Sequence, residues 1–121
     1  MSELLVVRSK VKEAAKGMHV SSDFADALSK ALANLVRDAE ARAQENKRST
    51  VMSKDLAFNF VAAKKVSDML VVRSKVKENI KKCNVAGDFA DALNRVAAFL
   101  LSEACRRAKD NKRSTVQARD L

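Results

Sequence analysis

The feature that most constrains the fold of this chain is an internal repeat. When the 121-residue sequence is shifted by 65 positions, residues 2–56 align with residues 67–121 without a gap, and 31 of the 55 aligned pairs are identical. The pentapeptide KRSTV, for example, stands at 47–51 and again at 112–116. A unit of about 55 residues can scarcely bury its apolar faces alone. We therefore expect the two copies to share one core, as a dimer within a single chain, rather than to form two separate domains.

Composition favours helices over strands. The chain has no proline, its glycines are Gly17 and Gly87, and its aromatic residues are five phenylalanines. Because proline and glycine are the usual punctuation of strands and turns, their scarcity indicates an all-α protein. The low aromatic content indicates a mostly aliphatic core. The sequence shows neither a secretory signal nor a segment of membrane-spanning length, so we expect a soluble, intracellular protein.

Each copy predicts the same order of helices. Apolar residues at alternating spacings of three and four predict a first helix of about four turns, with Ser2 or Ser67 as its N-cap. After a short loop we expect a second helix of some 22 residues, capped by Ser22 or Gly87. In the first unit, residues 1–65, the expected helices are 2–17, 22–44 and 56–65. In the second unit, residues 66–121, they are 67–84 and a long helix that begins near 87.

The apolar stripes of these helices form the predicted core. Leu5 and Val6 fall outside the first stripe, and the sequence offers Val6 no partner within the chain. We therefore regard Val6 as a candidate contact with another molecule. The predicted core residues are Leu4, Val7, Val11, Ala14, Met18, Phe24, Leu28, Ala31, Leu35 and Ala39 in the first copy, and Met69, Val72, Val76, Ile80, Cys83, Phe89, Leu93, Val96, Leu100 and Ala104 in the second.

Reactive side chains are too scattered to indicate an active site. Cys83 and Cys105 lie 22 residues apart without a CxxC unit or a flanking histidine, so we expect both to be reduced and neither to hold zinc. The single histidine, His19, has no catalytic partner at helical spacing. We therefore expect no catalytic residues, no metal site and no cofactor.

The order of elements carries a family resemblance. A short helix, a loop, a long helix, a loop ending in R-x-T-V-x-x-x-D-L and a third helix resemble the histone fold of archaeal and bacterial histones. The most specific match is the pair Arg48 and Asp55, repeated as Arg113 and Asp120. The resemblance implies that each arginine and aspartate clamp the second loop to the start of the third helix. The second copy ends at Leu121, and its nearly absent third helix is similar to that of short bacterial histones rather than archaeal ones.

The resemblance also implies how the two copies meet. Family histones are usually separate subunits that pair head to tail, so this chain resembles a histone doublet, or pseudodimer. In such a pair the first loop of one unit lies beside the second loop of the other. We therefore expect two short backbone bridges, one at each end of the molecule, with Val20 next to Val116 and Val85 next to Val51.

Basic residues gather on one predicted face. The chain carries a formal net charge of +9. On the first helix of each copy, three cations follow one another at intervals of four residues, and these stripes are continuous with the two basic loops. The predicted face consists of Arg8, Lys12, Lys16, Arg73, Lys77 and Lys81 on the helices, and Lys47, Arg48, Ser49, Thr50, Lys112, Arg113, Ser114 and Thr115 in the loops.

Double-stranded DNA is the partner that this face suits best. Lysine and arginine neutralise phosphates, and hydroxyls and loop N–H groups donate hydrogen bonds to phosphate oxygens. The face lacks a recognition helix, a zinc finger and aromatic residues for reading bases, so we expect little sequence preference beyond DNA bendability. The hypothesis is a monomeric doublet that bends or compacts chromosomal DNA in the cytoplasm, in the nucleoid. The sequence leaves open whether doublets assemble further.

Other classes of function remain as alternatives. A histone-fold protein–protein interaction module, or a subunit of a sequence-specific transcription factor, would turn its basic face to an acidic protein or to a third polypeptide. Such a protein would bind DNA weakly, with a shallow salt dependence. A structural helical protein, or an enzyme without visible motifs, is the remaining alternative. A DNA gel shift with the purified protein would separate these classes.

Overall fold

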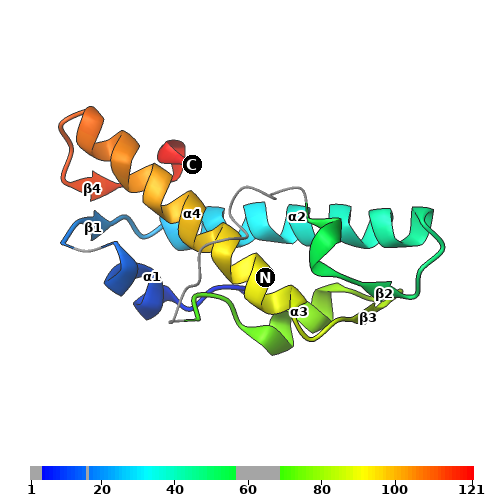
Figure 1. Ribbon diagram of the computed structural model, residues 1–121. Helices are drawn as coiled ribbons and strands as arrows, with labels where there is room; N and C mark the ends of the chain where they lie inside the picture. The colour runs from blue at the N-terminus through cyan, green and yellow to red at the C-terminus, as the bar shows by residue number, and fades with distance from the viewer. Residues whose placement is uncertain (1–3, 16, 57–68) are drawn as a thin grey trace.

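Two long helices that cross each other form the frame of the molecule (Figure 1). The computed structural model describes residues 4–15, 17–56 and 69–121. The long helices are α2 (Phe24–Glu45) and α4 (Phe89–Asp110), each of 22 residues, which confirms their predicted length. Each helix begins one residue later than expected. The N-caps are Asp23 and Asp88, not the predicted Ser22 and Gly87.

The buried faces of the long helices make most of the core. On α2, apolar residues spaced by three or four positions are almost fully buried, as this periodicity predicts. Of the core residues predicted on these two helices, Ala31, Leu35 and Leu100 are only half-buried because they lie beside the centre of the buried face. The buried set on the two helices is Phe24, Ala25, Leu28, Leu32, Val36, Ala39 and Ala43, with Phe89, Ala90, Leu93, Val96, Ala97, Leu101, Ala104 and Ala108.

Two pairs of short parallel strands close the molecule at its opposite ends (Figure 1). At one end, which we call the β1/β4 end, Val20 is the partner of Val116. At the other, the β2/β3 end, Val51 is the partner of Val85. Both predicted bridges between first and second loops are therefore confirmed. The strands are β1 (His19–Val20), β2 (Thr50–Val51), β3 (Asn84–Val85) and β4 (Thr115–Val116), and 3₁₀ turns follow at η1 (Ser53–Asp55) and η3 (Ala118–Asp120).

The first helix of each copy is shorter than the sequence suggested. Helices α1 (Arg8–Ala14) and α3 (Arg73–Asn79) have Val7 and Val72 as their N-caps, so the assignment of Ser2 and Ser67 to that position was wrong. The residues before α1 and α3 are extended instead. Val7 N–H donates to Leu70 O at 2.8 Å and Val72 N–H donates to Leu5 O at 2.7 Å. Branched valines suit this extended backbone, and each copy satisfies the N–H groups of the other.

This exchange of hydrogen bonds corrects the interpretation of Val6. Val6 pairs with Val71 in an isolated antiparallel bridge, and both side chains are 3 % exposed. Val6 therefore has a partner within the chain and is not a contact for another molecule. Leu5 is also buried, whereas Ala14 of the predicted stripe is exposed and Ala15 is buried in its place.

The ends of the short helices differ between the copies. Helix α1 ends at Ala14, and Gly17 follows with a φ of +86°, a left-handed conformation that glycine adopts without strain. Helix α3 ends at Asn79, earlier than predicted, and Asn84 lies in β3 rather than at the end of a helix. The same short helix is therefore ended by different means in the two copies.

Two buried polar side chains on the long helices hold the extended segments. Ser29 Oγ accepts a hydrogen bond from Leu5 N–H at 2.8 Å. Asn94 Oδ1, at the equivalent position of the second copy, accepts from Leu70 N–H at 2.6 Å and from Val71 N–H at 3.3 Å. Buried backbone donors need such acceptors, which explains polar residues at these core positions.

The predicted third helix, 56–65, lies outside the described residues except for Leu56, which is buried. The division into units 1–65 and 66–121 stays a prediction. Among the described residues, no helix combines the length and the apolar character that crossing a membrane requires.

Candidate nucleic-acid interface

An arginine–aspartate clamp organises the second loop at the β2/β3 end. Arg48 Nη1 donates to Asp55 Oδ2 at 2.8 Å and Arg48 Nη2 donates to Asp55 Oδ1 at 2.5 Å. Met52 N–H donates to the same carboxylate at 2.8 Å, and the Asp55 side chain is 3 % exposed. The hydrogen bond from Arg48 lowers the pKa of the Asp55 carboxyl, and the Met52 N–H lowers it further against the opposing effect of burial.

The β1/β4 end carries the same clamp. Arg113 bonds both carboxylate oxygens of Asp120, at 2.9 and 2.6 Å, and Gln117 N–H adds a third bond at 2.8 Å. The pKa of the Asp120 carboxyl is lowered for the same reasons, with Arg113 the main cause. The arginine–aspartate pairing that the resemblance implied is therefore present at both ends, where it ties the second loop to η1 or η3.

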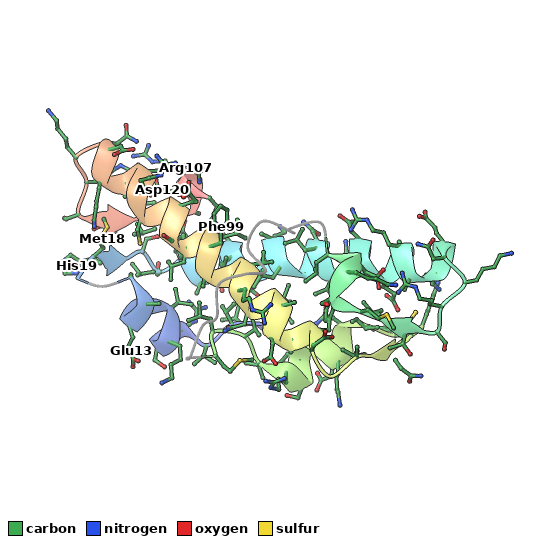
Figure 2. All side chains as sticks on the ribbon, viewed as in Figure 1. Glu13, Met18, His19, Phe99, Arg107 and Asp120 are labelled. Atoms are coloured by element: carbon green, nitrogen blue, oxygen red, sulfur yellow. The ribbon has the colours of Figure 1, made fainter. Side chains whose placement is uncertain are left out.

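A second arginine supports each clamp and was missed in the sequence. Arg107 Nη1 donates to the backbone oxygen of Asp120 at 2.7 Å, and Figure 2 shows the two residues together beside α4. Arg42 makes the same contact with Asp55 O at 2.8 Å. The available signal was an arginine 13 positions before each clamp aspartate, kept in both copies while most of its neighbours differ.

The turn before each clamp presents a lysine. Lys47 N–H donates to Gln44 O and Arg48 N–H donates to Ala43 O, at 3.0 and 2.9 Å, which is a Schellman motif at the end of α2. The motif requires a left-handed residue, and Lys47 has a φ of +58°. Glycine or asparagine is usual there, because a larger side chain costs roughly 1–2 kcal/mol. Lys112 repeats this conformation at the end of α4, so both ends have an exposed lysine in a strained position.

The strand pairing sets the loop hydroxyls on the outer surface. Asn84 N–H donates to Ser49 O at 2.7 Å, and His19 N–H donates to Ser114 O at 2.9 Å. Val51 and Val116 are fully buried, whereas both serines are exposed and the intervening Thr50 and Thr115 are half-buried. The loops thus place an exposed lysine and serine and a half-buried threonine at each end, and their contact with phosphate stays a prediction.

The arginines of the predicted basic face are already paired. Arg8 Nη2 donates to Asp26 Oδ1 at 2.7 Å, and Arg73 Nη2 donates to Asp91 Oδ1 at 2.6 Å, which ties each short helix to the start of a long one. Arg48 and Arg113 are engaged in the clamps. Lys16 lies outside the described residues. Within the predicted face, the described cations that remain exposed and form no ion pair with the described residues are Lys12, Lys47, Lys77, Lys81 and Lys112.

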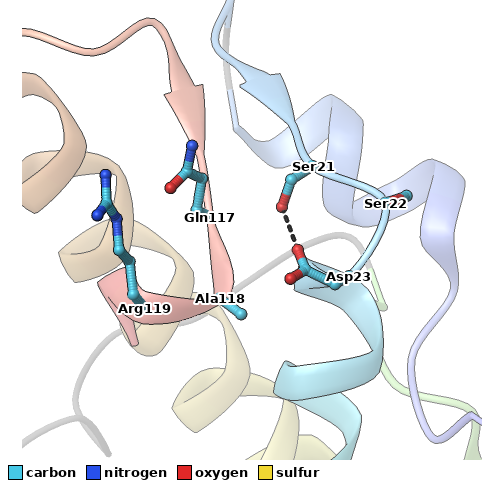
Figure 3. A pocket seen from close by; sticks show the side chains of 6 residues that line it. All are labelled: Ser21, Ser22, Asp23, Gln117, Ala118 and Arg119. Carbon is cyan, nitrogen blue, oxygen red and sulfur yellow. Dashed lines mark hydrogen bonds between the residues drawn. The ribbon is translucent and has the colours of Figure 1, made fainter.

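A shallow polar hollow lies between the copies at the β1/β4 end (Figure 3). Ser21 Oγ donates to Asp23 Oδ1 at 2.5 Å on one side of the hollow. Its lining residues are Ser21, Ser22, Asp23, Gln117, Ala118 and Arg119. Among the described residues, no group of three or more His, Cys, Asp or Glu side chains is arranged to hold a metal ion.

Comparison with known proteins identifies this architecture. The sequence matches no protein-family model and no curated protein. The crystal structure of the histone from Methanopyrus kandleri is similar, with a TM-score of 0.69 over 95% of this chain and 89% of that chain, at 16% sequence identity. The chain has a histone fold. Because the match covers nearly the whole chain, both copies of the repeat take part in this histone fold.

Proposed function

We propose that this histone-fold chain binds duplex DNA through the phosphate backbone, at both ends and with little sequence specificity. The observation that carries the proposal is the pair of clamped loops. Each loop holds an exposed lysine in a left-handed conformation beside a serine and a threonine. A strained backbone that recurs in both copies favours a role for the lysine charge beyond folding.

We also propose that the two copies are histone units paired head to tail within one chain. The strand pairs and the Val6–Val71 bridge join residues of the first copy to residues of the second, which supports this arrangement. Two phosphate-binding ends on one molecule would favour a duplex that curves between them, so the protein would bend or compact DNA in the nucleoid. Light scattering in high salt should give the mass of a single chain, and a stable dimer would contradict this pairing.

The salt dependence of DNA affinity tests the proposal. With the arginines of the predicted face engaged, about five exposed lysines of that face are available, which predicts a slope of log K against log salt of roughly −4 to −5. Lys47→Ala/Lys112→Ala should flatten the slope by about two and weaken binding equally on unrelated duplexes. Fluorescence anisotropy on two sequences across a salt series measures both quantities.

A matched variant controls for the loss of charge. Lys30→Ala/Arg37→Ala removes two exposed cations of α2 that form no ion pair with the described residues, and it should leave the slope nearly unchanged. A folded Lys47→Ala/Lys112→Ala variant with the wild-type slope would exclude the loops as phosphate contacts. Weak wild-type binding with a shallow slope would instead favour the interaction-module alternative, and loss on one sequence alone would mean that the protein reads bases.

A further inference from the structure

The two ends differ in one outward-facing strand residue. In the pairing of β1 with β4, His19 is the partner of Thr115 and Val20 is the partner of Val116. Successive side chains of a strand point to opposite faces. Since Val116 is fully buried, His19 and Thr115 face outward together, and His19 is exposed. Figure 2 shows His19 at the outer extremity of the molecule.

The imidazole therefore lies on the same face as Thr115, one of the groups that we propose to hold phosphate. The backbone N–H of His19 is bonded to Ser114 O, which fixes its strand next to the loop that presents Lys112. At the β2/β3 end the same position is occupied by Asn84, the partner of Thr50. The charged residues near the β1/β4 end include Lys12 and Glu13 of α1, Asp23 at the start of α2, and Arg107, Lys109, Asp110, Lys112, Arg113, Arg119 and Asp120 of α4, η3 and the loop between them.

We propose that His19 is a phosphate ligand at the β1/β4 end, so that acidification tightens the hold on DNA at this end alone. The inference rests on the proposed DNA binding. A neutral imidazole can donate one hydrogen bond to a phosphate oxygen, and protonation adds a positive charge. Histidine is the side chain that ordinarily gains this charge between pH 5 and 8. Asn84 is neutral throughout, so the two ends hold DNA with unequal strength at low pH.

The chain is well suited to a test because it contains a single histidine. DNA affinity of the full chain would be measured by fluorescence anisotropy at pH 5.5 and pH 7.5 over a salt series. One added phosphate contact should steepen the salt slope by about 0.9 at the lower pH, and should raise affinity roughly fivefold near 0.15 M salt. His19→Asn copies the residue of the other end and should remove most of this pH difference.

Two further variants use the repeat as an internal control. Asn84→His should roughly double the pH effect, because both ends then carry an imidazole. The exchange His19→Asn/Asn84→His should restore the wild-type effect from the opposite end. A folded His19→Asn variant that keeps the full pH difference would overturn the inference, as would an exchange variant that restores none of it. Steep salt dependence without a pH difference would refute only the role of His19, whereas absence of DNA binding at both pH values would refute the proposed function itself.

Discussion

The two ends of the molecule share a backbone and a clamp but differ in the side chains that join the two copies. At the β2/β3 end, Ser53 Oγ donates to Asp88 Oδ2 at 3.1 Å, and Lys82 N–H donates to Glu40 Oε2 at 2.7 Å. Both contacts cross from one copy to the other. At the β1/β4 end, alanine and cysteine replace that serine and that glutamate, at Ala118 and Cys105.

The aspartate that begins each long helix shows what the difference means. The Asp88 carboxylate accepts a hydrogen bond from the Ser53 hydroxyl of the other copy, whereas the Asp23 carboxylate accepts one from the Ser21 hydroxyl of its own loop. Both carboxylates accept a serine hydrogen bond, but this hydrogen bond joins the two copies only at the β2/β3 end. Both ends retain the strand pairing and the clamp, and each clamp lies within a single copy. We infer that the clamp is required for the fold, and that the other contacts set how firmly each end is closed.

The largest effect is expected from breaking a clamp. Asp55→Ala or Asp120→Ala removes a buried acceptor of three N–H groups, so each should lower the free energy of unfolding by about 1–3 kcal/mol. For a chain of this size, each kcal/mol corresponds to a fall in Tm of roughly 4 °C. Thermal unfolding followed by circular dichroism measures the change. Because the clamps are alike, the two variants should be similarly unstable, and an unchanged Tm in either would show that its end does not depend on the clamp.

Acid provides the control for this prediction. The folded-state pKa of each clamp carboxyl is lowered by its arginine, so the clamp contribution is present above the ordinary carboxyl pKa and is lost as pH falls through the folded value. The stability of the wild type should therefore approach that of the variants at low pH. A difference that stays constant down to pH 2 would assign the effect of the alanine to packing rather than to the charged pair.

A smaller effect is expected from the contacts that join the copies at the β2/β3 end. With those contacts in place, the amides of Asn84 and Ala86 should exchange with solvent more slowly than the equivalent amides of His19 and Ser21. Glu40→Ala/Ser53→Ala should remove much of this difference, which corresponds to about 1–2 kcal/mol of local opening or roughly tenfold in exchange rate. Hydrogen exchange followed by NMR resolves the four amides individually.

The converse substitution is expected to have the smallest effect. Ala118→Ser places at the β1/β4 end the hydroxyl that Ser53 supplies at the other, facing Asp23 across the hollow of Figure 3. It should slow exchange at His19 by about twofold to fivefold, because a half-exposed hydrogen bond contributes a fraction of 1 kcal/mol. Faster exchange would mean that the added hydroxyl disturbs the Ser21–Asp23 bond instead of closing the hollow.

The sequence predicted the parts of the fold that local spacing determines. The period of Phe24, Leu28 and their successors defines a buried helical face, and the repeated loop contains both members of its clamp within eight residues. The pairing of Val20 with Val116 was predictable once the resemblance supplied a head-to-tail arrangement. In each of these cases the deciding information lies in a short stretch or in the repeat.

The predictions were wrong where a residue's conformation or pairing depends on a partner that is far away in the sequence. Leu5, Val6 and Val7 fit a helix as well as a strand by spacing, and the extended form is chosen by bonds to Leu70 and Val72 of the other copy. Ser29, a polar residue at a core position, was the available signal of a backbone donor nearby. Arg8 counted as a free cation because Asp26, its partner, lies 18 residues away and on another helix.

The presence of both copies in one chain has a consequence for how such a protein can change. In a pair of identical subunits, every substitution appears twice, at symmetric places. Here a single codon change alters one end alone. The repeat therefore has His19 in one copy and Asn84 at the equivalent position of the other. Likewise Glu40 accepts a hydrogen bond from Lys82 N–H, whereas its equivalent in the second copy is Cys105. Substitutions can therefore make the two ends chemically different, which is impossible in a symmetric assembly of identical short chains.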